Sequence, residues 1–193
     1  MKVSALTVQY KQMTKLNPLK TVFGFDHFRS GQEEIVKAIT EGQNVLAIMP
    51  TGAGKSLCFQ LPAILREGVT VVISPLIALM RDQVRALQEL GVSAGAITSG
   101  NTQEEIDSVW ESLEKKKLKL LYIAPERLAA GSALGMLRRI GVSLIAVDEA
   151  HCVSQWGYDF RPDYLRIGEL RKALDVPIAA FTATADKETQ AEI

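Results

Sequence analysis

Cysteine is scarce in this sequence, and long apolar runs are absent from it. The two cysteines, Cys58 and Cys152, do not make a disulfide framework or a metal site, so we interpret both as reduced packing residues in a reducing compartment. No window approaches the roughly 18 uninterrupted apolar residues of a membrane span. The N-terminus also lacks the apolar core of a signal peptide. These absences predict a cytoplasmic protein.

An excess of charge of either sign is lacking too. The sequence holds 22 Lys and Arg residues against 22 Asp and Glu residues, so its formal net charge is zero. Bulk basicity therefore does not indicate a nucleic-acid partner, and such binding would depend on where single Arg and Lys residues lie. The basic run at 115–117 follows a helical pattern, and we interpret it as a solvated helix end.

What the sequence does have is a regular alternation of short apolar runs and helical patterns. Because the runs are apolar on both faces, they predict parallel strands covered by helices on both sides, in an α/β domain with a mostly parallel sheet. The six runs span 44–49, 69–74, 93–98, 119–124, 143–148 and 177–182. Residues 1–22 are weakly periodic, and we expect them to be a lead-in to a single domain at 23–193.

A polar or glycine-bearing segment follows each apolar run. In chain order these segments read PTGAGKS, SPLIAL, TSGNT, APERL, DEAH and TATA. In an open α/β sheet the ligand binds outside the carboxyl ends of the strands. We therefore expect a site assembled from these segments along one edge of the sheet.

The segment PTGAGKS has the chemistry of a phosphate-binding loop. Gly52 and Gly54 would let backbone N–H groups turn inward around an anion at the start of a helix near Lys55. Lys55 could reach the β- and γ-phosphates, and the Ser56 hydroxyl could bind Mg²⁺. The strict pattern has an earlier glycine where Met49 stands, so the match is incomplete. The alternative is a glycine turn followed by an exposed Lys-Ser pair.

The segment DEAH places two acidic residues side by side at a strand end. Such a pair is electrostatically costly unless a cation lies nearby or one member acts as a base. In a nucleotide hydrolase Asp148 would hold Mg²⁺ and Glu149 would polarise the attacking water. The alternative is a helix N-cap. His151 is either a packed neutral side chain or a link from the acidic pair to neighbouring strand-end loops.

Taken together and in this order, PTGAGKS, SPLIALMRDQV, APERL, DEAH and TATA resemble the first motor domain of superfamily 2 helicases. Two more segments are similar to those of the RecQ family of DNA helicases. They are FGFDHFRSGQEEIV at 23–36 and the aromatic-rich AHCVSQWGYDFRPDY at 150–164. The resemblance covers about residues 20–190.

The resemblance implies a RecA-like ATP-binding motor domain of a 3′-to-5′ DNA helicase that acts in repair or recombination. It implies ATP and Mg²⁺ as cofactors, single-stranded and partly duplex DNA as partners, and a monomeric protein. Such helicases place ATP between two motor domains, and the second supplies arginines that stabilise the transferring phosphate. A second motor domain and the C-terminal modules do not follow in this sequence, so we interpret it as part of a longer protein with weak or no activity alone.

The resemblance also implies roles for individual residues. Phe25 would stack on the base, Arg29 would lie over the base or reach a phosphate, and Gln32 would read the adenine edge. The other nucleotide-binding residues are Thr51, Gly52, Ala53, Gly54, Lys55 and Ser56, with Ser56 and Asp148 as metal ligands and Lys55, Asp148, Glu149 and His151 as catalytic residues. The expected DNA contacts are Ser74, Arg81, Ser99, Asn101, Arg127, Trp156, Phe160 and Arg161.

Several alternatives stay open at this point. Phe23 and Phe28 fit core packing better than ligand contact. Thr182 and Thr184 either link the phosphate site to DNA or form a strand-end turn. Tyr158 stands where the family usually has histidine, which would alter coupling of hydrolysis to strand separation. The functional alternatives are a non-hydrolysing, nucleotide-gated DNA-binding module and an RNA helicase domain.

Overall fold

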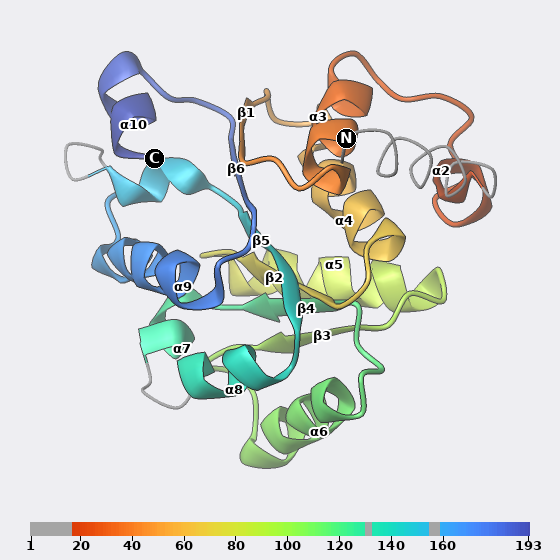
Figure 1. Ribbon diagram of the computed structural model, residues 1–193, viewed down its shortest axis with the longest axis vertical. Helices are drawn as coiled ribbons and strands as arrows, with labels where there is room; N and C mark the ends of the chain where they lie inside the picture. Colours follow the sequence, from red (N-terminus) through yellow and green to blue (C-terminus); the bar gives the residue numbers. More distant parts are fainter. Residues whose placement is uncertain (1–16, 130–132, 155–158) are drawn as a thin grey trace, which may run out of the picture.

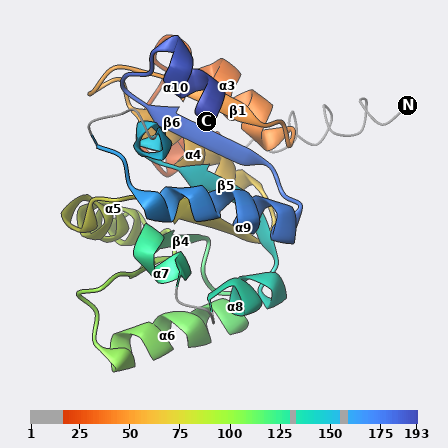
Figure 2. The ribbon, with the colours of Figure 1, turned by 90° about the vertical axis from the view of Figure 1, so that its left-hand side faces the viewer.

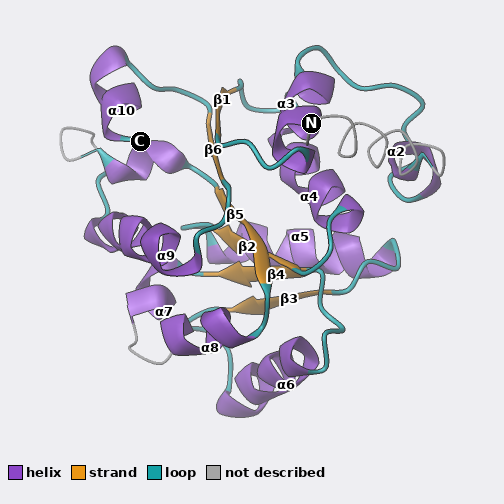
Figure 3. Ribbon diagram, viewed as in Figure 1, coloured by secondary structure: helices purple, strands orange, loops and turns teal. Residues whose placement is uncertain are grey.

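The computed structural model describes residues 17–129, 133–154 and 159–193. Six strands form one sheet in the order β1-β6-β5-β2-β4-β3, and every neighbouring pair is parallel. Each strand overlaps one of the six predicted runs, so the predicted α/β class is confirmed (Figure 3). The strands are β1 Val45–Ile48, β2 Val69–Ile73, β3 Ala94–Ile97, β4 Leu120–Ile123, β5 Val142–Val147 and β6 Ile178–Thr182.

Helices cover both faces of this sheet (Figure 1). One layer contains α2 Pro18–Thr21, α3 Gln32–Thr40, α4 Lys55–Leu65 and α5 Ile77–Glu89. The opposite layer contains α6 Gln103–Glu114, α7 Pro125–Ala129, α8 Ala133–Arg139 and α9 Ile167–Leu174. Figure 2 shows the molecule from the side of α7 and α9. The remaining described elements are η2 Ala150–Val153, η3 Pro162–Arg166 and α10 Lys187–Glu192.

Two buried clusters fill the space between the sheet and each helix layer. Successive residues of a strand point to opposite faces. Accordingly Val71 and Ile73 of β2 lie in one cluster while Val72 lies in the other. This double burial explains why the runs are apolar throughout rather than alternating with polar residues.

Helix α4 lies deepest of the helices that begin at a strand end. Eight of its residues are buried, and Phe59 meets Phe181 of β6 edge to face at a centroid distance of 5.3 Å. Burying two aromatic rings against each other fixes α4 over β6. The residues at the N-terminus of α4 are therefore held at a defined place on the sheet edge.

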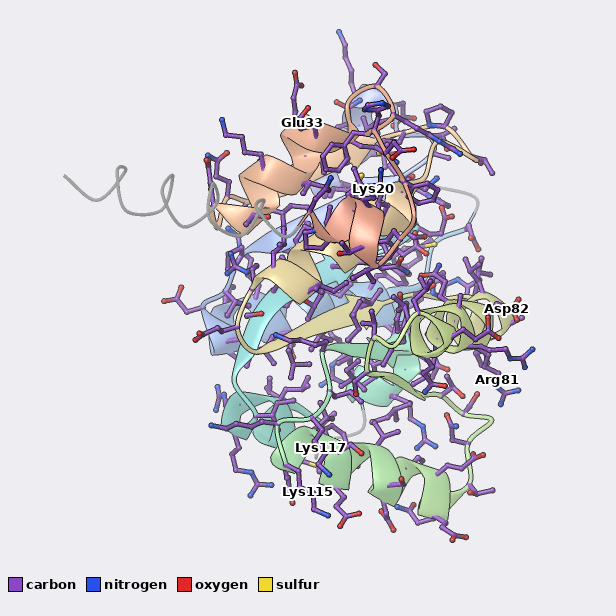
Figure 4. The ribbon with its side chains drawn as sticks, turned by 90° about the vertical axis from the view of Figure 1, so that its right-hand side faces the viewer. Lys20, Glu33, Arg81, Asp82, Lys115 and Lys117 are labelled. Carbon is purple, nitrogen blue, oxygen red and sulfur yellow. The ribbon has the colours of Figure 1, made fainter. Side chains whose placement is uncertain are left out.

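Two segments outside the sheet test predictions about burial and charge. Leu19 of α2, inside the expected lead-in, is buried in the cluster around α4. Lys115, Lys116 and Lys117 follow the end of α6 and are exposed, which confirms a solvated helix end (Figure 4). Among the helices in the described ranges, none is long and apolar enough to cross a membrane.

Candidate active site

All six carboxyl ends lie at the same edge of the parallel sheet, which brings the predicted segments together. Along that edge the loops after β1, β6 and β5 are neighbours, and they carry PTGAGKS, TATA and DEAH. We call this part the phosphate-loop half. The loops after β2, β4 and β3 continue the edge, and we call them the arginine half. The sheet order therefore brings the loop after β1 next to the loops after β6 and β5, although β2, β3 and β4 lie between them in the chain.

The loop after β1 has the backbone that its two glycines permit. Gly52 and Gly54 have φ values of 81° and 85°, a region that side chains other than glycine rarely adopt. A Cβ on Gly54 would also lie 2.5 Å from Gln32 Nε2. Ala53 is not among the positive-φ residues, so alanine is compatible with its place. No side chain caps α4 at Gly54, which leaves N–H groups of its first turn available to an anion.

Three consecutive carbonyl groups of this loop are held from one side by the segment before α3. Arg29 Nη1 donates to Gly52 O at 2.7 Å, and Gln32 Nε2 donates to the carbonyls of Ala53 and Gly54 at 3.2 Å each. A trans peptide points its C=O and N–H in opposite directions. Holding the carbonyls of Ala53 and Gly54 therefore turns the N–H groups of Gly54 and Lys55 to the other side.

This arrangement differs from the role expected for Gln32. The side chain is 2 % exposed, and its Oε1 accepts from the Arg29 N–H at 2.8 Å while its Nε2 holds the loop. The amide is thus already occupied by protein partners, and an adenine edge is not needed to satisfy it. Contact with adenine stays a prediction that requires these bonds to rearrange.

Lys55 and Ser56 open α4 directly beneath the loop. Lys55 Nζ donates to Met49 O at 3.2 Å, so the ammonium group reaches back across the loop to the end of β1. Burial raises the pKa of Asp148, and the positive charge of Lys55 offsets a small part of that rise. Ser56 is half-buried beside it. The structure thus joins the two motifs that the sequence separates by 93 positions, from Lys55 to Asp148.

Asp148 is an acidic side chain in a buried position, 5 % exposed. Its backbone N–H donates to Ile73 O, and its carboxylate accepts from Ser74 Oγ at 3.3 Å and from the Glu149 N–H at 3.0 Å. Burial raises the pKa of Asp148, and the neighbouring Glu149 carboxylate raises it further, against the lowering by these hydrogen bonds and Lys55. A nearby cation would remove much of this cost.

The alternative interpretation of the acidic pair as an N-cap is wrong. Glu149 precedes η2, and no side-chain hydrogen bond caps that helix. Glu149 instead has φ 49°, an uncommon value for a residue other than glycine. Strained backbone of this kind tends to occur at functional sites. Glu149 thus stands at the N-cap position of η2, but neither carboxylate caps that helix through a side-chain hydrogen bond.

His151 connects this acidic pair to the loop after β6. Its Nδ1 lies 2.9 Å from Thr182 Oγ1 and 3.3 Å from Glu149 Oε2. Thr182 Oγ1 in turn donates to Thr184 O at 2.8 Å and accepts from the Thr184 N–H at 3.3 Å. The TATA segment is thus a hydroxyl-stabilised turn, as the second interpretation predicts, and Thr182 also contacts His151. A link from the phosphate site to DNA stays a prediction.

The arginine half is built around the loop at 98–101. Arg81 of α5 donates from Nη2 to Gly100 O at 3.0 Å, and Arg127 of α7 donates from Nε to Thr98 O at 3.3 Å. Figure 4 shows Arg81 projecting from α5 away from the body of the domain. Two cations from different helices therefore bond to the backbone of one strand-end loop, and their contact with DNA stays a prediction.

Asn101 and Ser99 lie within that loop, but only Ser99 is exposed. Asn101 Oδ1 accepts from both the N–H and the Oγ1 of Thr98, and Nδ2 donates to Glu105 Oε2 at 3.1 Å. Asn101 therefore shapes the loop. Ser74, expected along the DNA, requires a correction: it is 2 % exposed, and its hydroxyl donates to Asp148.

The predicted aromatic residues divide by exposure. Phe25 is 48 % exposed, whereas Phe23 and Phe28 pack against the core, which confirms the packing interpretation for those two. Phe160 and Arg161 are half-buried at the end of the aromatic-rich segment. Trp156 and Tyr158 lie outside the described residues, and so do residues 1–16 of the expected lead-in.

The structure adds two side chains that the sequence did not single out. Tyr164 is 1 % exposed and donates its hydroxyl to Asp148 O at 3.0 Å, and burial raises its pKa, which keeps the phenol a donor. Asp159 lies 3.6 Å from Arg161 and 3.9 Å from His151 Nε2. Both belong to the aromatic-rich segment, and its sequence pattern points to the aromatic side chains rather than to these polar contacts.

These features define a RecA-like domain with a phosphate loop and an acidic strand end, and comparison with known proteins agrees. The model of the DEAD/DEAH box helicases matches residues 29–193, so the chain belongs to the DEAD/DEAH box helicase family. Among solved structures it resembles the Hef helicase domain of Pyrococcus furiosus, with a TM-score of 0.66 and 25 % identity over 86 % of this chain and 35 % of that one.

Within that family, the chain is similar to curated proteins named RecQ. The chain is 49 % identical to the ATP-dependent DNA helicase RecQ of Haemophilus influenzae, over 93 % of this chain and 29 % of the relative. It is 51 % identical to the protein of the same name from Bacillus subtilis, over 89 % of this chain and 29 % of the relative. The chain therefore spans less than a third of the length of these relatives.

Proposed function

We propose that this chain is the ATP-binding motor domain of a RecQ-type DNA helicase. The observation that carries the proposal is the buried Asp148, held by Ser74 and in electrostatic contact with Lys55 at the end of the phosphate loop. An acidic group kept at this cost beside a lysine and open helix N–H groups suits Mg²⁺-nucleotide chemistry.

The residues present fit a magnesium nucleotide. The donor set at the strand end is all oxygen, from Asp148 and the Ser56 hydroxyl, which is the set that Mg²⁺ prefers. Bound Mg²⁺ would neutralise charge on the β- and γ-phosphate oxygens. Lys55 would exchange its bond to Met49 O for phosphate oxygens, and the N–H groups of Gly54 and Lys55 would complete the cradle.

Glu149 is the residue placed to act on water. Its carboxylate lies next to Asp148 and within 3.3 Å of His151 Nδ1. In this proposal Glu149 orients the attacking water and accepts its proton, while His151 holds the carboxylate in place. Because His151 also contacts Thr182, the state of this site is transmitted to the loop after β6.

The arginine half would bind DNA. Arg81 and Arg127 lie on either side of the exposed Ser99, and Phe160 with Arg161 adds a π-face and a cation. Phe25 would stack on the nucleotide base. The whole protein would add a second motor domain with phosphate-binding arginines. Movement from 3′ to 5′, a role in repair or recombination, a monomeric state and a cytoplasmic location belong to the same proposal, supported by the resemblance to RecQ.

The experiment compares the wild-type chain with Lys55→Ala and Lys117→Ala. Lys117 is exposed beyond α6 and serves as a matched control for loss of one lysine (Figure 4). Binding of a fluorescent ATP analogue with Mg²⁺ is measured by anisotropy, and ATP turnover is measured with no strand, with single-stranded DNA and with RNA of the same sequence. We expect Lys55→Ala to weaken binding at least about tenfold, the equivalent of about 1.4 kcal/mol, and Lys117→Ala to match the wild type.

The turnover decides between the functional alternatives. We expect slow hydrolysis by this chain alone, because the second domain's arginines are not part of it. Turnover that rises with DNA and vanishes in Lys55→Ala would mean that the domain is self-sufficient or borrows an arginine from a second copy. Stimulation by RNA but not DNA would favour an RNA helicase. Equal nucleotide binding by the wild type and Lys55→Ala would overturn the proposed site.

A further inference from the structure

Three potential metal-binding atoms converge where η2 meets the end of the aromatic-rich segment. Cys152 Sγ lies 3.5 Å from Asp159 Oδ2 and 3.9 Å from His151 Nε2, and His151 Nε2 lies 3.9 Å from Asp159 Oδ2. The three atoms thus form a nearly equilateral triangle, and these residues are the one such mixed group found among the described parts of the chain. A count of cysteines alone misses it, because only one member is a cysteine.

The hydrogen bonds around Thr182 determine which His151 nitrogen is available. The single hydroxyl hydrogen of Thr182 goes to Thr184 O, so Thr182 Oγ1 can only accept from His151. His151 Nδ1 must therefore carry a hydrogen and donate it. In that tautomer of the neutral ring, Nε2 is unprotonated and faces Cys152 and Asp159, and the Cys152 thiol donates its hydrogen to Asp159 Oδ2. A cation that replaces this hydrogen would be attracted by all three groups.

Glu149 supplies the support that histidine metal ligands commonly have. A metal-bound histidine usually donates its other N–H to a carboxylate or carbonyl, which fixes the ring and raises its basicity. Here the Nδ1 hydrogen faces Thr182 Oγ1 at 2.9 Å and Glu149 Oε2 at 3.3 Å, and both acceptors lie on the side of the ring away from the triangle. These two acceptors together orient the ring, with Thr182 as the nearer partner.

We propose that His151 Nε2, Cys152 Sγ and Asp159 Oδ2 form a binding site for a borderline-soft divalent cation, with Zn²⁺ as the best fit. Tetrahedral zinc bonds of about 2.0–2.3 Å place ligand atoms about 3.3–3.6 Å apart. The pair Sγ–Oδ2 already meets that spacing, and the other two pairs, each 3.9 Å apart, need to contract by about 0.3–0.6 Å. Three protein ligands leave the fourth position for water.

This site is distinct from the proposed magnesium site in its chemistry. A thiolate and an imidazole favour zinc-like ions, whereas Mg²⁺ prefers oxygen ligands. The Asp159 side chain is 42 % exposed, which gives an ion a route in from solvent, while Cys152 is buried beneath it. Arg161, 3.6 Å from Asp159 Oδ1, would have to share that carboxylate with the ion.

A bound ion would restrain the connection between the proposed ATP site and the proposed DNA-binding segment. The ion would join His151, which contacts Glu149, to Asp159 at the end of the aromatic-rich segment. Burial raises the pKa of the Cys152 thiol to about 12, and Asp159 contributes to the rise. The ion must displace that proton, so its apparent affinity should increase with pH.

Cobalt is the probe for this site, because it is a spectroscopic substitute for zinc. The chelator-treated 193-residue chain is titrated with Co²⁺, and the absorption spectrum is recorded. A thiolate-to-cobalt charge-transfer band with tetrahedral d–d bands is expected, and Zn²⁺ but not excess Mg²⁺ should abolish both. The chain has two cysteines and two histidines, which provide matched controls.

Single substitutions show which residues produce the cobalt absorption bands. Cys152→Ser should lose the charge-transfer band, whereas Cys58→Ser should keep it. His151→Ala should bind Co²⁺ at least tenfold more weakly, whereas the exposed His27→Ala should match the wild type. Asp159→Asn is the conservative variant that keeps the fold, checked by circular dichroism, and it too should weaken binding at least tenfold. No charge-transfer band in the wild type, a band that survives Cys152→Ser, or displacement by Mg²⁺ would each overturn the proposal.

Discussion

The phosphate-loop half and the arginine half differ in how far their polar side chains are buried. In the phosphate-loop half, Gln32, Asp148 and Thr182 are buried, and their polar atoms bond to other parts of the protein. In the arginine half, Arg81 and Ser99 are exposed, and the loop is held mainly by its own local turn. One half is preorganised around charge in the interior, and the other presents charge to solvent.

This difference in burial indicates which kind of ligand each half could favour. A buried acidic residue is costly until a cation arrives, so in the proposed function the phosphate-loop half would select a small, highly charged ligand. In the proposed function, the exposed Arg81 and the half-buried Arg127 would contact a long, flexible polyanion and position it without reading sequence. Ser74 joins the halves, because it directly follows β2 in the arginine half while its hydroxyl donates to Asp148 in the other half.

The largest effect is expected from Asp148→Asn. The change keeps the shape but removes the charge, so Mg²⁺ should no longer strengthen binding of the ATP analogue, a loss of at least about tenfold, or about 1.4 kcal/mol. Affinity measured with and without Mg²⁺ checks this. Asp82→Asn, on the exposed face of α5, is the matched control and should behave as the wild type (Figure 4).

The same variant should be more stable than the wild type at pH 7 without nucleotide. Burial and Glu149 raise the folded-state pKa of Asp148, so the folded protein holds that proton more tightly than the unfolded chain does. The contribution of Asp148 to stability therefore falls as pH rises from the unfolded pKa, about 3.9, through the folded pKa, and remains unfavourable above it. Thermal unfolding from pH 4 to 8 should show the advantage of Asp148→Asn growing with pH; a constant difference would argue against the buried charge as its cause.

Next in size is the loss of both arginines from the other half. Arg81→Ala combined with Arg127→Ala should weaken single-stranded DNA binding by roughly tenfold and make the salt dependence shallower by about 0.7 for each phosphate that is no longer neutralised. Nucleotide affinity should not change. Titrations of labelled DNA at several salt concentrations test this, with the exposed Arg138→Ala on α8 as control. An unchanged salt slope in the double variant would remove these residues from the DNA surface.

The sequence predicts the strands well because double burial leaves a clear pattern. All six apolar runs became strands, and parallel pairing placed their polar ends together, which follows from topology alone. Lys55 and Asp148 were found because phosphate and metal chemistry demand those residue types. The functional consequences of that geometry, ATP use and DNA binding, stay proposals.

What the sequence does not determine is the direction of individual side chains. Ser74 directly follows β2, and nothing in the neighbouring sequence reveals that its hydroxyl turns to Asp148 rather than to solvent. Gln32 has a versatile amide, and only the position of α3 shows that loop carbonyls occupy it. The group His151, Cys152 and Asp159 depends on a chain reversal within the aromatic-rich segment, which spacing alone does not encode.

A smaller effect should follow from Ser74→Ala, which tests the junction of the halves. The variant removes one donor from the Asp148 carboxylate, and losing such a bond typically costs about 1–3 kcal/mol. We expect weaker Mg²⁺-nucleotide binding and unchanged DNA affinity, measured with the same two assays. The exposed Ser99→Ala, in the loop after β3, should show the reverse pattern. If Ser74→Ala instead weakened DNA binding alone, the residue would belong to the arginine half after all.

The smallest effect should come from Thr102→Ala, at the start of α6. Thr102 Oγ1 accepts from the Glu105 N–H at 3.3 Å, while Glu105 Oε2 accepts from the Thr102 N–H at 2.9 Å, a reciprocal cap that also holds Asn101. Losing the threonine should cost about 1 kcal/mol, or about 2–4 °C in Tm for a domain of this size.

Because this cap lies beside the loop at 98–101, its loss should loosen the arginine half alone. Thermal unfolding and DNA titration should each change slightly, and nucleotide affinity should stay at the wild-type value. Ser108→Ala, exposed on the same helix, is the control and should be neutral. Equal weakening of nucleotide and DNA binding by Thr102→Ala would mean that the halves are mechanically coupled through the sheet, since no hydrogen bond of the Thr102 cap reaches the phosphate loop in the described residues.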